Sequence, residues 1–72
     1  MAISYNRLWK LLIDKNMKRV ELRDAARIST NVLARLGRDE PVSMVSMEKI
    51  CRVLGCNIGD VMEFTYSREE GI

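Results

Sequence analysis

The apolar residues of this chain recur with a helical period, in short runs that are interrupted at several points. The first run places four apolar residues at positions i, i+3, i+4 and i+7, which lie on one face of a helix. These residues are Tyr5, Leu8, Trp9 and Leu12. The interruptions are residues that favour caps, turns or loops, and they are Asn16, Ser29, Gly37, Pro41 and Gly55. Helices fit between these interruptions and strands do not, so the pattern predicts an all-α fold.

Five helices are predicted from this pattern. They cover about residues 5–15, 19–27, 30–36 and 47–54, with a fifth that begins at residue 58. Four of them follow a side chain that can accept a hydrogen bond from a free N–H of the first turn. These predicted caps are Ser4, Ser29, Ser46 and Asn57. Gly37 and Gly55 stand where the third and fourth helices can end in a left-handed residue. Lys18, before the second helix, lacks capping chemistry, which typically costs about 1 kcal/mol.

The inward faces of these helices supply the predicted core. Leu11 and Ile13 widen the face of the first helix. The remaining core residues are expected to be Leu22, Ala25, Ala26, Leu33, Leu36, Met47, Ile50, Cys51, Leu54, Ile58, Val61 and Met62. A chain of 72 residues, 47% of them hydrophobic, makes a single domain. We place this domain at residues 1–64, followed by a polar, acidic tail at residues 65–72.

Several classes of function are not expected. The sequence has no histidine, no glycine-rich phosphate loop and no clustered carboxylate pair, so we predict no enzyme. Cys51 and Cys56 fall short of the four ligands of a usual metal site and are interpreted as packing residues. We therefore expect no metal, no cofactor and no small-molecule ligand. No apolar run approaches the ~20 residues that span a bilayer, and residues 1–5 do not resemble a secretory signal. A cytoplasmic location without membrane contact, with both thiols reduced, is the expectation.

Charge divides the chain into two halves. Residues 1–38 carry nine bases and three acids, a net charge of +6, whereas residues 39–72 carry a net charge of −4. A basic end joined to an acidic end is expected of a protein that presents one side to a polyanion. The same charges can also serve only to solvate helices, so the asymmetry alone is a modest indication of nucleic acid.

Residues 19–36 combine two short helices with a tight turn between them, which is the helix-turn-helix arrangement. If the second helix enters a major groove about 12 Å wide, its outward residues reach base edges. Thr30, Asn31 and Arg35 suit this role, because asparagine can bond adenine, and arginine guanine, in a bidentate manner. The alternative is that Thr30 and Asn31 only cap the helix and that Arg35 is an ordinary solvated residue.

The run LRDAARISTNVLARL, residues 22–36, resembles the helix-turn-helix of the Cro/repressor-type, or lambda-repressor-like, DNA-binding domains. The run MEKICRVLGCNIGD, residues 47–60, resembles the fourth helix of that family and the start of its fifth. Residues 5–15 resemble the first helix of small bacterial members. The resemblance covers about residues 3–64, nearly the whole chain.

The resemblance implies a five-helix transcriptional regulator, most often a repressor, whose third helix reads the major groove of double-stranded DNA. It also implies a homodimer on an inverted repeat, with half-sites about one helical turn (~34 Å) apart. By position, Thr30, Asn31 and Arg35 fall where such proteins contact bases. The residues that fall at phosphate contacts are Lys18, Arg19, Ser29 and Arg38, and Arg27 is a further candidate.

Three features depart from the pattern of the family. Arg23 stands where a small residue is common, so its side chain must extend out of the contact between the second and third helices. Arg27 stands where a glycine is common, and it must either tolerate the turn or shift it. Each can be an extra phosphate ligand or a solvated stem that covers apolar surface, and for Arg23 we favour the solvated stem. Asp39 and Glu40 follow the third helix where phosphates would be near, which suggests a modest affinity.

A different class of function is compatible with the same fold. The domain can be a protein-interaction module, such as an antitoxin-like partner, that works through its acidic half. Salt dependence separates the two, because a protein that neutralises Z phosphates shows a log–log slope of about −0.9Z.

Overall fold

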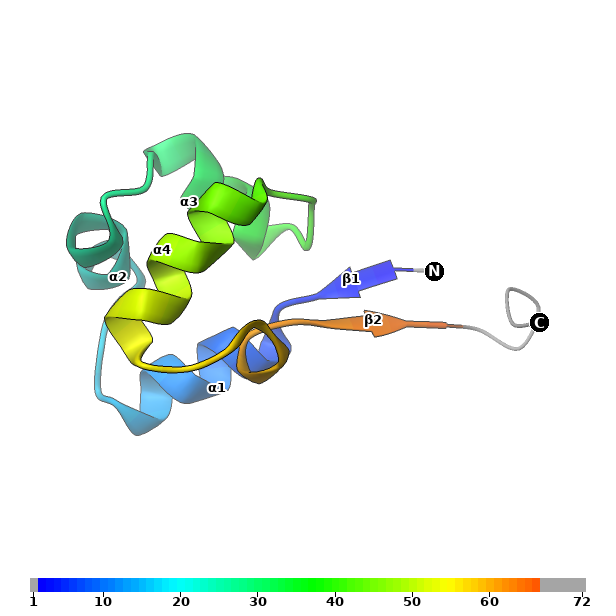
Figure 1. The fold of residues 1–72 in the computed structure, drawn as a ribbon, viewed down its shortest axis with the longest axis horizontal. Helices are drawn as coiled ribbons and strands as arrows, with labels where there is room; N and C mark the ends of the chain where they lie inside the picture. The colour runs from blue at the N-terminus through cyan, green and yellow to red at the C-terminus, as the bar shows by residue number, and fades with distance from the viewer. Residues whose placement is uncertain (1, 67–72) are drawn as a thin grey trace.

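The computed structural model describes residues 2–66, and within them the chain forms four α-helices, one short 3₁₀ helix and a two-stranded sheet. In chain order the elements are β1 (Ala2–Ser4), α1 (Asn6–Asp14), α2 (Arg19–Ala26), α3 (Thr30–Gly37), α4 (Met44–Leu54), η1 (Ile58–Asp60) and β2 (Glu63–Thr65). The helices gather into one body, and the ribbon of β1 and β2 projects from it (Figure 1).

The predicted apolar faces form one core. Its buried hydrophobic residues are Tyr5, Leu8, Leu12, Leu22, Ala26, Ile28, Leu36, Met47, Ile50, Leu54 and Val61. Three predicted core residues were wrong, since Ile13 is 76% exposed, Ile58 is 38% exposed and Ala25 is also exposed. Ile13 and Ala25 each directly adjoin a buried residue, Leu12 or Ala26. Neighbours on a helix point about 100° apart, so only one of each pair can face the core.

The prediction of an all-α, five-helix fold was wrong in its last element. Where a fifth helix was expected, the chain makes the single turn of η1 and then enters β2, which pairs antiparallel with β1. The expected cap spacing is present, because the N–H of Asn57 donates to Asp60 Oδ2 at 3.0 Å. Strand pairing then takes over, with Ile3 opposite Phe64. β2 extends to Thr65, and residues 67–72 of the predicted tail lie outside the described residues.

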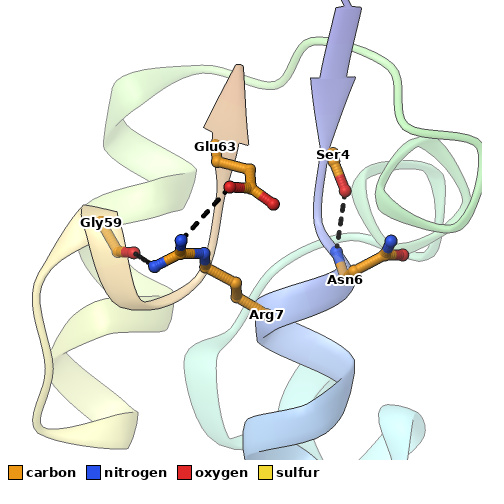
Figure 2. Close-up of polar contacts among 5 residues, drawn as sticks. All are labelled: Ser4, Asn6, Arg7, Gly59 and Glu63. Atoms are coloured by element: carbon orange, nitrogen blue, oxygen red, sulfur yellow. Dashed lines mark hydrogen bonds and ion pairs between the residues drawn. The ribbon is translucent and has the colours of Figure 1, made fainter. Parts of the chain in front are cut away.

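Hydrogen bonds fix α1 to this ribbon, as Figure 2 shows. The guanidinium of Arg7 donates to the carbonyl of Gly59 at 3.3 Å and to Glu63 Oε2 at 3.2 Å. At the start of the helix, the N–H of Asn6 donates to Ser4 Oγ at 3.3 Å. Ser4 therefore accepts a bond from the first turn as predicted, although the N-cap position itself is Tyr5.

The predicted helix ends are confirmed at two places and wrong at two others. Ser29 caps α3 by accepting from the N–H of Val32, and Gly55 ends α4 with φ +65°. Ser46, in contrast, lies inside α4, which is capped one turn earlier by Ser43. The extra turn carries Met44 and Val45, whose side chains are exposed, so no apolar period marked it. Gly37 lies within α3, and the left-handed residue after that helix is Asp39, with φ +56°.

Arg27 tolerates the turn that the family commonly forms with glycine. It ends α2 in the left-handed conformation, with φ 57° and ψ 43°, and its N–H donates to the carbonyl of Arg23. For a residue with a Cβ this conformation costs roughly 1–2 kcal/mol. The structure therefore has a strained arginine in the turn between α2 and α3.

Replacing Arg27 with glycine is expected to raise the free energy of unfolding by about 0.5–1 kcal/mol. Glycine removes the left-handed strain, and its greater freedom in the unfolded chain offsets part of that gain. The measurement is urea unfolding followed by circular dichroism. Asn16→Gly is the matched control, because Asn16 has φ 55° and asparagine tolerates this conformation. An R27G variant less stable than N16G would show that contacts of the Arg27 stem outweigh the strain.

Candidate nucleic-acid interface

α2 and α3 are both eight residues long and are joined by a three-residue turn, residues 27–29. α2 is anchored by Leu22 and Ala26, which are buried, and it packs mainly against α4. α3 is anchored by Leu36 and leaves most of its surface to solvent. The result is a short helix with an open outer face, and this helix packs against α2, which in turn packs against α4.

The three predicted base-reading residues all lie on that open face. Thr30 and Asn31 stand in the first turn of α3 and Arg35 in its last turn, and all three are exposed. Ser29 uses its hydroxyl oxygen to cap the helix, at 3.1 Å from the nitrogen of Val32, and it keeps a proton to donate. The side chains needed for hydrogen bonding to base edges therefore have no protein covering them.

Arg23 connects the two helices in a way that sequence reasoning missed. Its Nε donates to Asp24 Oδ1 at 3.0 Å and its Nη1 donates to Thr30 Oγ1 at 3.4 Å. The side chain is 31% exposed, so the solvated stem that we favoured from the sequence is in part covered. The signal available in the sequence was a long cation where the family commonly has a small residue. Arg23 thus helps to orient the hydroxyl of Thr30.

Lys18 and Arg19 lie at the start of α2, and the side chain of Arg19 reaches the end of α3. The N–H of Lys18 donates to Glu21 Oε1 at 2.8 Å, which supplies part of a capping box although Lys18 itself lacks capping chemistry. The guanidinium of Arg19 stacks on the ring of Trp9, 3.7 Å from its centroid. A Cβ on Gly37 would lie 3.6 Å from Arg19 Nη1. Of these two predicted phosphate ligands, Arg19 therefore lies beside the C-terminal end of α3.

Arg38, at the end of α3, makes an ion pair. Its Nε and Nη2 donate to the two carboxylate oxygens of Glu40 at 3.0 and 3.1 Å. These bonds lower the pKa of Glu40 and raise that of Arg38. The neighbouring Asp39 accepts from the N–H of Tyr5 at 3.1 Å, and burial together with Asp39 raises the pKa of the Tyr5 hydroxyl. Both acids that follow α3 are therefore engaged by the protein itself.

Arg27 stands in the turn between α2 and α3, together with Ser29. It lines a shallow hollow between α2 and α4 together with Lys49 and Arg52. Arg52 also forms an ion pair with Glu48 one turn earlier on α4. Lys49 and Arg52 were not among the predicted phosphate ligands. They come close to Arg27 through the packing of α2 against α4, which local sequence patterns do not reveal.

The two cysteines meet at the end of α4. Cys51 and Cys56 are free thiols, both half-buried against the core, and the N–H of Cys56 donates to the carbonyl of Cys51. Burial and the nearby Cys56 raise the pKa of the Cys51 thiol, which favours its protonated form. Within the described residues, no group of three or more potential ligands is placed to hold a metal ion. No helix in residues 2–66 is long and apolar enough to cross a membrane.

Comparison with known proteins places this geometry in context. Residues 7–66 match the profile of the family described as the Cro/C1-type HTH DNA-binding domain. The fold is similar to the crystal structure of the transcriptional regulator VanUg, with a TM-score of 0.84 and 48% sequence identity. That match covers 86% of this chain and 83% of the other. No curated protein gives a significant match.

Proposed function

This chain belongs to the family of Cro/C1-type helix-turn-helix DNA-binding domains, and from that premise we propose that it is a sequence-specific repressor that binds its operator as a homodimer. α3 enters the major groove, where Thr30, Asn31 and Arg35 read bases. The phosphate contacts come from Lys18, Arg19, Arg27, Ser29 and Arg38. The similarity to a transcriptional regulator supports the regulatory role. Repression is steric, because the bound dimer occupies DNA that the polymerase needs.

The observation that carries this proposal is the open face of α3. Its polar residues are exposed while Leu36 holds the helix against the core, so the face is both accessible and fixed in place. Cations stand at both of its ends, with Arg19 beside Gly37 and Arg23 beside Thr30. This arrangement matches the two needs of an operator reader, which are base-edge contacts and a surrounding frame of phosphate contacts.

Pairing of two copies is supported by the projecting ribbon. Each of its strands has one edge without a partner among residues 2–66. Phe64 in β2 is 50% exposed and Tyr66, directly after it, is 63% exposed. Unpaired strand edges and exposed aromatic side chains are both features of surfaces that bind other chains. We therefore assign the dimer contact to this ribbon.

The test is selection of bound sequences from a pool of random duplexes at about 150 mM salt, which suppresses nonspecific phosphate binding. The expected result is enrichment of an inverted repeat with half-sites about one helical turn (~34 Å) apart. A single enriched half-site without a repeat would retain base reading and reject the dimer. No enrichment would favour a protein-interaction module, for which the exposed aromatic residues of the ribbon would be the contact surface.

Replacing Lys18 with alanine is expected to weaken binding to all duplexes alike and to reduce the salt slope by about one unit. Lys18 is exposed at the start of α2 and, as a phosphate ligand, carries no sequence information. The measurement is fluorescence anisotropy of a labelled duplex across a range of salt concentrations. Lys10→Ala is the matched control, because Lys10 is an exposed lysine on the side of α1 that faces Gly55 and Cys56. Equal effects of K18A and K10A would mean that net charge alone, and not a phosphate contact, is responsible.

A further inference from the structure

Glu40 is held in place by its backbone on both sides. Its N–H donates to the carbonyl of Arg35 in the last turn of α3, at 2.9 Å. Its carbonyl accepts from the hydroxyl of Tyr5, a buried core residue, at 2.8 Å. An acid at this point of a loop would normally be free to turn away from DNA. These two bonds instead fix the start of its side chain beside the C-terminal end of the open face.

The carboxylate of Glu40 uses both oxygens to hold Arg38. The donors are Nε and Nη2, at 3.0 and 3.1 Å, which form the fork that arginine also offers to a phosphate. The carboxylate is also close enough to the charge of Arg35 for that charge to favour its ionised form. Glu40 thus stands between two of the proposed DNA-binding arginines and occupies the fork of one of them.

A phosphate that approaches the end of α3 therefore has to compete for Arg38. It must replace two existing charge-assisted hydrogen bonds, and it meets the negative charge of a carboxylate whose backbone is fixed beside the end of α3. The other acid of this loop is engaged elsewhere, because Asp39 Oδ1 accepts from the N–H of Tyr5. The gain from an Arg38–phosphate contact is then only the difference between two similar ion pairs.

We propose that Glu40 is an autoinhibitory residue, whose carboxylate takes the place of a DNA phosphate on Arg38 and so limits sequence-independent binding. This inference rests on the proposed function, and it concerns the affinity of that same surface. With Arg38 engaged, a larger share of the binding free energy has to come from base contacts. The neutral isostere Glu40→Gln keeps both backbone hydrogen bonds, and it removes the negative charge and one of the two oxygen acceptors that hold Arg38.

The experiment measures binding of the full chain and its variants to a labelled duplex of mixed sequence, about two helical turns (roughly 21 bp) long. E40Q is expected to bind about fivefold more tightly at ~150 mM salt, with a salt slope steeper by about 0.9, because one phosphate contact is added. Arg38→Ala is expected to weaken the wild-type protein by less than it weakens E40Q, and to abolish the gain in the E40Q background. Unfolding of each variant in urea checks that the fold is retained.

Glu48→Gln is the matched control. It removes the same charge from another exposed ion pair, that of Glu48 and Arg52 on α4. If E40Q and E48Q change the affinity equally, the inference is wrong although DNA binding stands. It is equally wrong if R38A weakens the wild-type protein as much as it weakens E40Q. If none of the proteins binds DNA, the proposed function falls and this inference with it.

Discussion

Replacing Arg35 with alanine is expected to weaken binding to the selected operator by about 1–3 kcal/mol, or roughly 5- to 150-fold. Arg35 is exposed in the last turn of α3 and, among the three proposed base-reading residues, is the one with a planar fork that can pair with O6 and N7 of guanine. Loss of that pair removes discrimination at one position of each half-site. Binding to a duplex of mixed sequence should change much less, because no base contact is lost there.

The control for this prediction is Arg35→Lys. Lysine keeps the positive charge but offers a point charge in place of a planar fork, so it retains the salt slope and loses most of the bidentate contact. The measurement is a repeat of the selection with each variant, together with anisotropy on the wild-type operator. If R35A instead weakened every duplex equally and R35K restored the binding, Arg35 would be a phosphate ligand, and base reading would rest on Thr30 and Asn31.

The helical part of the fold was predictable because it depends on local periodicity. A buried residue such as Leu22 or Ile50 can be recognised in the sequence from apolar neighbours three and four positions away. The end of α4 can be recognised from Gly55, because glycine adopts the left-handed conformation without steric cost. The ribbon was not predictable in this way. Ile3 and Phe64 pair across the whole length of the domain, and neither three-residue strand is long enough to show an alternating pattern.

The candidate site shows the same division between local and long-range information. Exposure of Thr30, Asn31 and Arg35 followed from their places on a short amphipathic helix. The partners of the charged residues did not follow, because a long side chain can reach any of several neighbours. The sequence placed Glu40 near the interface, but its bidentate contact with Arg38 and its anchor on Tyr5 depend on tertiary structure. The charge asymmetry therefore indicated that the proposed DNA-binding surface lies in the basic half of the chain. It did not indicate which cations there are held in ion pairs.

Replacing Leu36 with alanine is expected to lower the free energy of unfolding by about 2–5 kcal/mol. Among the eight residues of α3, all of which the structure describes, Leu36 alone is buried, and its exposed fraction is 0%. Truncation leaves a cavity between α3 and the rest of the core, and the backbone can close it only by moving the helix. Small domains of this kind have roughly 0.05–0.15 kcal/mol of stability per residue, so the loss would take a large part of the total.

Leu33→Ala is the matched control, since this substitution makes the same side-chain change on the same helix, but at a half-buried position. Urea unfolding followed by circular dichroism should give a loss for L33A of about half that for L36A or less, because the lost transfer free energy scales with buried apolar area. Equal losses would mean that α3 is held by its whole inner edge and not by one anchor. In that event Val32 and Leu33 would also hold the open face rigid. Replacing Leu36 alone would then cost no more free energy of DNA binding than free energy of unfolding.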